Sequence, residues 1–120
     1  MYYSNLRGVM AKKARAVSEI MLPQDTVDML VRDHENGTGF LSEAKEGFDT
    51  NEARIIYEIS GNRIKVIYDF YTPDLRTAIM HGLEIVSKVS IRILAQTSGL
   101  SDENIRFQSV RGMWIDFMEA

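Results

Sequence analysis

The sequence of 120 residues contains no cysteine and only two histidines. The absence of cysteine excludes disulfide bonds, thiolate zinc sites and cysteine nucleophiles. His34 and His81 alone cannot form a histidine-rich metal site. Long apolar runs are also missing, because no stretch reaches the roughly 18 residues that cross a bilayer. The segment MYYSNLRGVMAKKARA lacks the apolar region of a secretory signal, so we expect a cytoplasmic protein without a membrane contact.

Acidic and basic residues are unevenly distributed along the chain. Residues 1–20 carry four bases and one acid, whereas residues 21–52 carry eight acids and two bases. The first segment includes Lys12, Lys13 and Arg15, which are the candidate contacts to a nucleic acid. A dedicated nucleic-acid binder has a pronounced basic stripe, which is absent here. On charge alone, a solvated surface of uneven charge is therefore the more frequent explanation.

The first half of the chain predicts a strand, a helix and a loop. AVSEIML (16–22) is rich in β-branched and apolar residues, which predicts a strand. QDTVDMLVRDHE (24–35) has apolar residues at helical spacing and acids in its first turn, which predicts a helix of about three turns. NGTG (36–39) should end it, because Asn and Gly tolerate the positive φ of a C-cap. Residues 40–52 are acidic and weakly patterned, so we expect a loop with a short helical turn.

Residues 53–70 contain the strongest local pattern, ARIIYEIS-GN-RIKVIYDF. Two alternating runs flank Gly61 and Asn62, which is typical of a two-residue type II′ hairpin. Such a loop places Ser60 opposite Arg63 and fixes every other pair. The apolar face then pairs Ile59 with Ile64, Tyr57 with Val66 and Ile55 with Tyr68, and the other face pairs Glu58 with Lys65, Ile56 with Ile67 and Arg54 with Asp69. A slip of one residue would destroy both patterns.

The stretch YTPDLRTAIMHG (71–82) predicts the start of a long helix. Thr72 is the expected N-cap, Pro73 the first helical residue, and Asp74 suits the positive end of the helix dipole. The helix should run to about Gln96 and end near Gly99. A heptad-like apolar stripe follows from Leu75, Ile79, Gly82, Val86, Val89 and Ile93. Apolar residues such as Leu83 also lie off this stripe, so the helix is expected to touch more than one neighbour.

The predicted order is strand, helix, strand, strand, long helix and a tail. It indicates an α+β fold with two layers, in which a three-stranded, mostly antiparallel sheet carries two helices on one face. We expect one domain over residues 1–120, with a basic arm (1–14), an α+β core (15–99) and a C-terminal extension (100–120). In the extension, IRFQSV alternates as a strand does. MWIDFM predicts a helical turn, because Trp114 and Phe117 are at helical spacing.

No residues form a recognisable catalytic or metal motif, and no cofactor is expected. His81 has no acid or nucleophile placed to make it a base, and His34 suits a helix C-terminus. Arg76 is a cation in a first helical turn, where the dipole disfavours it, which suggests a partner elsewhere. Ile56 and Ile67 are apolar in the middle of a charged hairpin face. These features favour oligomerisation or a protein partner over catalysis.

The segment YDFYTPDLRTAIMHGLEIVSKV resembles the small dimer-forming subunit of the KEOPS complex, which makes threonylcarbamoyl-adenosine in tRNA. In that family a strand leads through a polar turn into a long helix that opens with Leu-Arg. Leu75-Arg76 match this dipeptide, and Leu83 matches a later aliphatic position. Met80-His81 stand where the family has two small polar residues. The resemblance covers residues 15–97.

The resemblance implies a non-enzymatic, homodimeric scaffold that docks the catalytic subunit of the complex through the long helix. Lys12, Lys13 and Arg15 would make a weak contact with tRNA. The partner-binding residues would be Leu75, Arg76, Ile79, Met80, His81, Leu83, Ile56 and Ile67. A stand-alone α+β dimer and a small-ligand-binding regulatory domain are the alternatives, because the same fold plan serves both.

Overall fold

The structure is a computed structural model that describes residues 12–98 and 113–118. It is an α+β domain whose antiparallel sheet has the strand order β2-β3-β1-β4. The strands are β1 (Lys12–Met21), β2 (Arg54–Ser60), β3 (Arg63–Thr72) and β4 (Met113–Met118). The helices are α2 (Gln24–Glu35), α3 (Phe40–Ala44), α4 (Leu75–Thr77), the π-helical turn η1 (Ala78–Gly82) and α5 (Leu83–Ser98).

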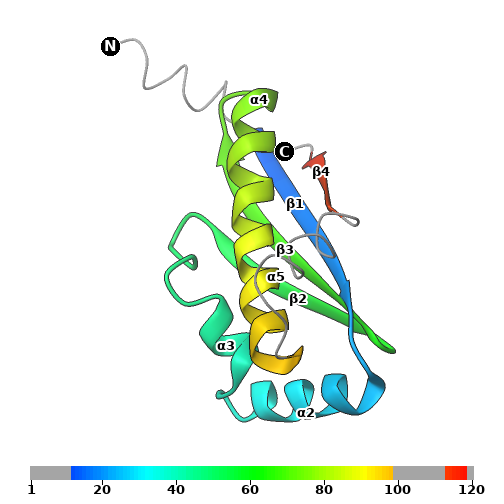
Figure 1. The fold of residues 1–120 in the computed structure, drawn as a ribbon. Coiled ribbons are helices and arrows are strands. Elements are labelled where there is room, and N and C mark those ends of the chain that lie inside the picture. The colour runs from blue at the N-terminus through cyan, green and yellow to red at the C-terminus, as the bar shows by residue number, and fades with distance from the viewer. Residues whose placement is uncertain (1–11, 99–112, 119–120) are drawn as a thin grey trace.

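The helices lie in one layer against the sheet. Figure 1 shows α4 and α5 as one continuous rod along the sheet, with α2 crossing near its lower end and α3 beside it. The predicted class and the order strand, helix, strand, strand, helix are confirmed. In the described ranges, no helix combines the length and the apolar character that a membrane span needs.

The β2–β3 hairpin has the predicted register at every pair. Gly61 opens the turn with φ +60°, the left-handed conformation that a type II′ turn requires at this position. The backbone N–H of Leu22 donates to the carbonyl of Asn62 at 3.0 Å, which ties the end of β1 to the same turn. Local side-chain alternation and a glycine are therefore sufficient to fix this register.

The two short helices also follow the sequence pattern. α2 spans the predicted segment 24–35 and ends before Gly37, which has φ +77°. α3 is the helical turn expected within residues 40–52. The Tyr57 hydroxyl donates to the Leu41 carbonyl at 2.7 Å, so α3 is bound to β2.

Both ends of the predicted core differ from expectation. β1 begins at Lys12, so part of the expected basic arm belongs to the sheet. The helical turn predicted for MWIDFM is wrong, because these residues form β4, with Trp114 opposite Val17 of β1. The edge of β1 offers backbone hydrogen bonds that an isolated helical turn cannot match. The other predicted piece, IRFQSV, lies outside the described residues.

The start of the helical rod also corrects the prediction. Thr72 is the last residue of β3, and Asp74 is the capping residue instead. One carboxylate oxygen of Asp74 accepts a hydrogen bond from the backbone N–H of Thr77 at 2.7 Å. The Thr72 hydroxyl donates to the Asp74 carbonyl at 3.0 Å, which stabilises the turn between strand and helix.

The predicted apolar stripe holds from Gly82 onward but not at Ile79. Val86, Val89 and Ile93 are fully buried against the sheet, but Ile79 is 42% exposed and Ala78 is buried in its place. The cause is η1, because a π-helical turn contains about one residue more than an α-helical turn. The extra residue rotates the helical residues before Gly82 about the helix axis, relative to Val86, Val89 and Ile93.

The core lies between the rod and the inner face of β1 and β3. Gly82 is buried at the closest approach, where an added Cβ would lie 2.8 Å from a Phe70 ring carbon and 2.9 Å from the Ala16 Cβ. Ser18 and Ser90 form a buried polar pair, with their hydroxyl oxygens 3.0 Å apart. Small residues thus let the rod lie directly on the sheet.

Candidate functional site

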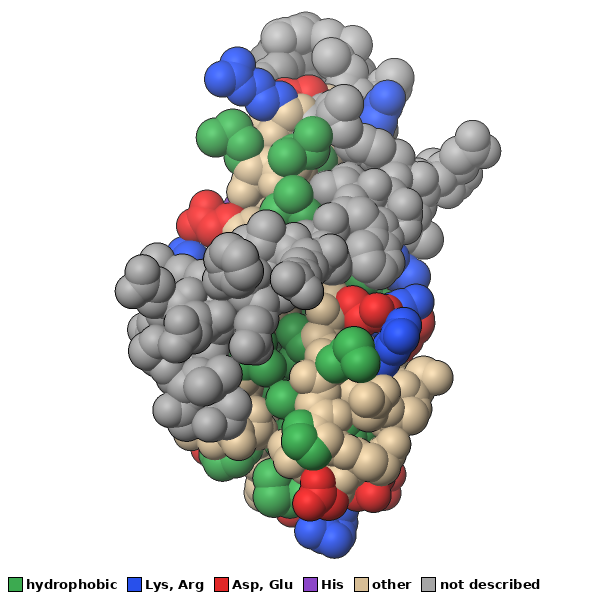
Figure 2. Space-filling model, turned by 45° about the vertical axis from the view of Figure 1, so that its right-hand side comes forward, with side chains coloured by type: hydrophobic (Ala, Val, Ile, Leu, Met, Phe, Trp, Pro, Cys, Tyr) green, Lys and Arg blue, Asp and Glu red, His purple; other side chains and the backbone are tan. Residues whose placement is uncertain are grey.

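Two large apolar side chains are exposed at the start of the rod. Ile79 is 42% exposed and Met80 is 63% exposed, while Leu83 is half-buried beside the core. Arg76 is exposed and lies three to four residues before them, on the neighbouring part of the helix surface. We call Arg76, Ile79 and Met80 the helix-start patch. Figure 2 shows hydrophobic side chains close to basic ones at the upper end of the molecule.

His81 is bound to the sheet. Its Nε2 lies 3.3 Å from the Tyr68 hydroxyl, and its ring packs edge-on against Tyr68 and Phe70, with both centroid distances 5.7 Å. Burial raises the pKa of Tyr68, so its hydroxyl stays protonated and can donate to the imidazole. His81 therefore anchors η1 on β3.

Arg76 lies close to an acidic group on its own helix. The backbone N–H of Thr77 chiefly lowers the pKa of Asp74, and the Arg76 charge contributes to the same shift. This nearby carboxylate reduces the cost of a cation in the first turn. The unfavourable interaction predicted between Arg76 and the helix dipole is thus reduced by Asp74 on the same helix. The Arg76 side chain remains exposed to solvent.

Ile56 and Ile67 lie on the sheet face that points away from the helices. Residues of even number on β3 pack under the rod, and Ile67 has the opposite orientation. Ile67 is 2% exposed, Val17 beside it is 3% exposed, and Ile56 is half-buried. The predicted partner-binding residues whose side chains are described are therefore divided between the rod and the outward face of the β2–β3 hairpin, and Ile67 is buried on that face. For Leu75 the structure describes the backbone only.

The basic residues proposed for nucleic acid are not equivalent. Lys12 is exposed and Lys13 is half-buried. Arg15 forms two parallel hydrogen bonds with the Asp69 carboxylate, at 2.7 and 3.0 Å, and Asp69 is buried. A guanidinium held in this bidentate geometry is largely neutralised. Of the three, Lys12 is thus the best placed to meet an external anion.

The outward face of the sheet, here called the open face, has an ordered pattern of charge. The register of β2, β3 and β1 produces three rows across the strands. The rows are Arg54–Asp69–Arg15, Ile56–Ile67–Val17 and Glu58–Lys65–Glu19. Charges alternate within each outer row and are opposite between the two rows, with an apolar row in the middle. Val17 and Glu19 were not identified from sequence, although the alternation in ARAVSEI carries the signal.

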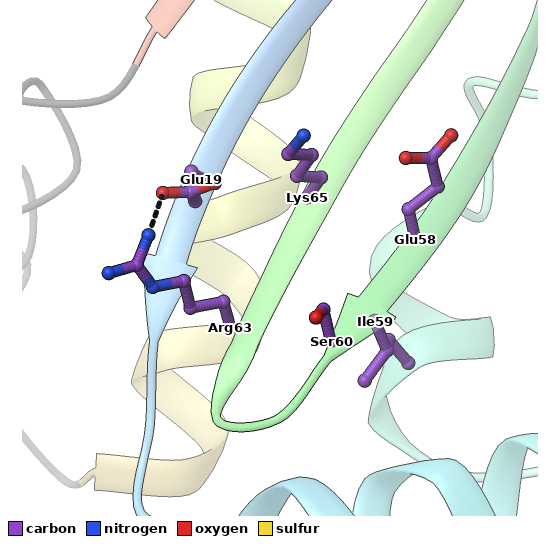
Figure 3. A pocket seen from close by; sticks show the side chains of 6 residues that line it. All are labelled: Glu19, Glu58, Ile59, Ser60, Arg63 and Lys65. Carbon is purple, nitrogen blue, oxygen red and sulfur yellow. Dashed lines mark hydrogen bonds and ion pairs between the residues drawn. The ribbon is translucent and has the colours of Figure 1, made fainter.

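A cavity of about 460 Å³ opens near the hairpin end of this face. Figure 3 shows its lining side chains on three neighbouring strands, with Arg63 paired to Glu19. The Arg63 Nη1 and the Glu19 Oε1 are 3.5 Å apart. The lining residues are Glu19, Glu58, Ile59, Ser60, Arg63 and Lys65. Two acids and two bases give the cavity no net charge, so it favours neither anions nor cations.

Two comparisons of the sequence with known proteins identify no relative. No protein-family model matches the sequence. None of the curated proteins matches it either. Within the described ranges, no group of three or more His, Asp or Glu side chains is arranged to hold a metal ion. Functional inference therefore depends on the surfaces described above.

Proposed function

We propose that this protein is a non-catalytic, homodimeric scaffold that binds a larger protein through the helix-start patch. By resemblance, that protein would be the catalytic subunit of a cytoplasmic complex that makes threonylcarbamoyl-adenosine in tRNA. The observation that carries the proposal is the exposure of Ile79 and Met80 at the start of the rod. Clustered exposed apolar side chains typically mark a surface that another molecule covers.

The π-helical turn supports this proposal. An uninterrupted α-helix would have placed Ile79 on the apolar stripe with Val86 and Val89, whereas η1 rotates it outward. Single π turns occur frequently at functional sites. Burial of each of the two side chains by a partner would contribute on the order of 1–2 kcal/mol. The adjacent Arg76 could add a charged contact at the border of the interface.

The proposal is tested by co-purification from the protein's own cells. The tagged wild-type protein should recover a catalytic subunit or tRNA, and the double variant Ile79→Ser/Met80→Ser should lose about 30-fold to 700-fold in affinity. Met21→Ser is the matched control, because Met21 is 58% exposed but lies at the far end of β1. Recovery of neither component by the wild-type protein would exclude the KEOPS assignment.

The alternative of a small-ligand-binding domain is supported by one observation, the open-face cavity. Its balanced charge and the existing ion pair between Arg63 and Glu19 fit a solvated surface as well as a ligand. The two functions are distinguished by the same variants. A ligand-binding protein should tolerate changes in Ile79 and Met80, whereas a scaffold should not.

A further inference from the structure

β2 is an edge strand of the sheet with backbone groups that point outward. In a two-residue hairpin Ser60 and Arg63 form a hydrogen-bonded pair, so alternate residues from Ser60 backward face β3. Ile55, Tyr57 and Ile59 consequently turn their N–H and C=O groups away from the sheet. The Ile55 N–H donates to the Asp49 carboxylate at 2.7 Å. In the described part of the chain, no hydrogen bond is seen to the outward groups of Tyr57 and Ile59.

The charge rows of the open face select one way of pairing this edge with a second copy. If two β2 strands run antiparallel about a two-fold axis at Ile56, Arg54 lies opposite Glu58 of the partner subunit, and Ile56 lies opposite its own copy. An axis at Tyr57 would put Ile56 against a carboxylate, and an axis at Glu58 would put two carboxylates together. Opposite charges stabilise such cross-strand pairs and like charges destabilise them.

The same axis also continues the rows beyond β2. The row Arg15–Asp69–Arg54 of one copy joins the row Glu58–Lys65–Glu19 of the other, so that charges alternate without interruption across both subunits. The two apolar rows join end to end through Ile56. On the opposite sheet face, Ile55 meets Tyr57 of the partner subunit. The backbone supports the same register, because the N–H and C=O groups of Ile55 and Tyr57 both point away from β3. Ile55 of one copy and Tyr57 of the other would therefore form a hydrogen-bonded pair.

We propose that two copies of this chain associate through antiparallel β2 edges centred on Ile56, which forms one continuous sheet. The Asp49 carboxylate competes with this pairing, because the carbonyl of Tyr57 of the partner subunit would accept the Ile55 N–H in its place. The proposal rests on the homodimer of the proposed function and gives it an interface. It leaves the helix-start patch free, since that patch belongs to the rod and not to the sheet edge.

The absence of cysteine makes a cross-linking test straightforward. In the purified full-length variant Ile56→Cys, the two thiols would sit at a non-hydrogen-bonded pair with Cα atoms about 4.5 Å apart. This separation is within the range of a disulfide, so mild oxidation should give a covalent dimer. Ile59→Cys is the control, because Ile59 lies on the same edge but about 20 Å from its own copy in this register. Ile56→Cys should cross-link about tenfold faster or more.

Two further variants test the role of Asp49. Asp49→Ala, combined with Ile56→Cys, should accelerate cross-linking, whereas Asp49→Asn retains an oxygen acceptor and should change the rate little. Equal rates of cross-linking for Ile56→Cys and Ile59→Cys would contradict the proposed interface. An unchanged rate with Asp49→Ala would show that the Asp49 carboxylate does not compete with strand pairing. Neither experiment involves the catalytic subunit or tRNA. Failure of this inference is therefore distinguishable from failure of the scaffold function.

Discussion

At the scale of single residues, the Ser18–Ser90 pair between β1 and α5 is a buried hydrogen bond between two polar side chains. Both side chains are fully buried, and each hydroxyl has the other as a neighbour at 3.0 Å. A buried polar group without a partner costs free energy, whereas removal of both partners can be nearly neutral. The pair should therefore behave as a unit.

We expect Ser90→Ala to lower the free energy of unfolding by about 1–3 kcal/mol, because the Ser18 hydroxyl loses its partner. The double variant Ser18→Ala/Ser90→Ala should recover part of this loss. Urea unfolding of the two single variants and the double variant measures the coupling. Simple addition of the two single effects would show that the hydroxyls act independently.

At the scale of elements, the fit of the rod on the sheet depends on Gly82. A change from glycine to alanine inside a helix normally stabilises it by about 1 kcal/mol. Here the new methyl group would overlap Phe70 and Ala16, both of which are buried in the core. Helix propensity and packing thus act in opposite directions at this position.

We expect packing to dominate, so Gly82→Ala should destabilise the fold by about 1–3 kcal/mol despite its better helix propensity. Thermal unfolding followed by circular dichroism shows whether Gly82→Ala lowers or raises the stability of the fold. Ser87→Ala, at a half-buried position one turn later, is the control for propensity alone. A stabilised Gly82→Ala protein would contradict the close approach of rod and sheet.

The sequence predicts those elements whose cause is local. The β2–β3 register follows from alternation and one glycine, and α2 follows from spacing and its C-terminal Gly37. The π turn is not predicted, because no local pattern of residue types specifies it; in the structure Gly82 and His81 of this turn contact the sheet. The spacing of Trp114 and Phe117 predicts a helical turn and not β4, because the extended form of this segment becomes favourable only at the edge of β1.

At the scale of the whole molecule, the candidate site consists of two separate surfaces. One is the helix-start patch on the rod, and the other is the open face of the sheet. The family resemblance implies that residues of the rod bind a partner, and Ile79 and Met80 at the start of the rod are exposed. Ile56 and Ile67, also expected to bind a partner, lie on the hairpin face that the alternation predicts, where Ile67 is only 2% exposed. The alternation of a hairpin thus predicts the sheet face of each residue, but not how deeply a residue such as Ile67 is buried on that face.

The separation of these surfaces predicts independent behaviour. Adding Ile79→Ser/Met80→Ser to the Ile56→Cys protein should leave the rate of disulfide cross-linking unchanged, because distant sites without shared contacts act additively. Non-reducing gel electrophoresis over a time course measures this rate. A slower reaction in the triple variant would indicate that the rod, and not the β2 edge, brings two copies together.

The position of β1 in the sheet has a consequence for the order of folding. β2 and β3 are joined by two residues, so their pairing closes a short loop on a timescale of about 1–10 μs. β1 lies between β3 and β4, and its partners Tyr71 and Met118 are far from Lys13 in sequence. Pairs between such distant residues form slowly, because a long loop must close first. Of the two inner strands, β1 is thus expected to be the last to gain both neighbours, and until then its two edges are open to other chains.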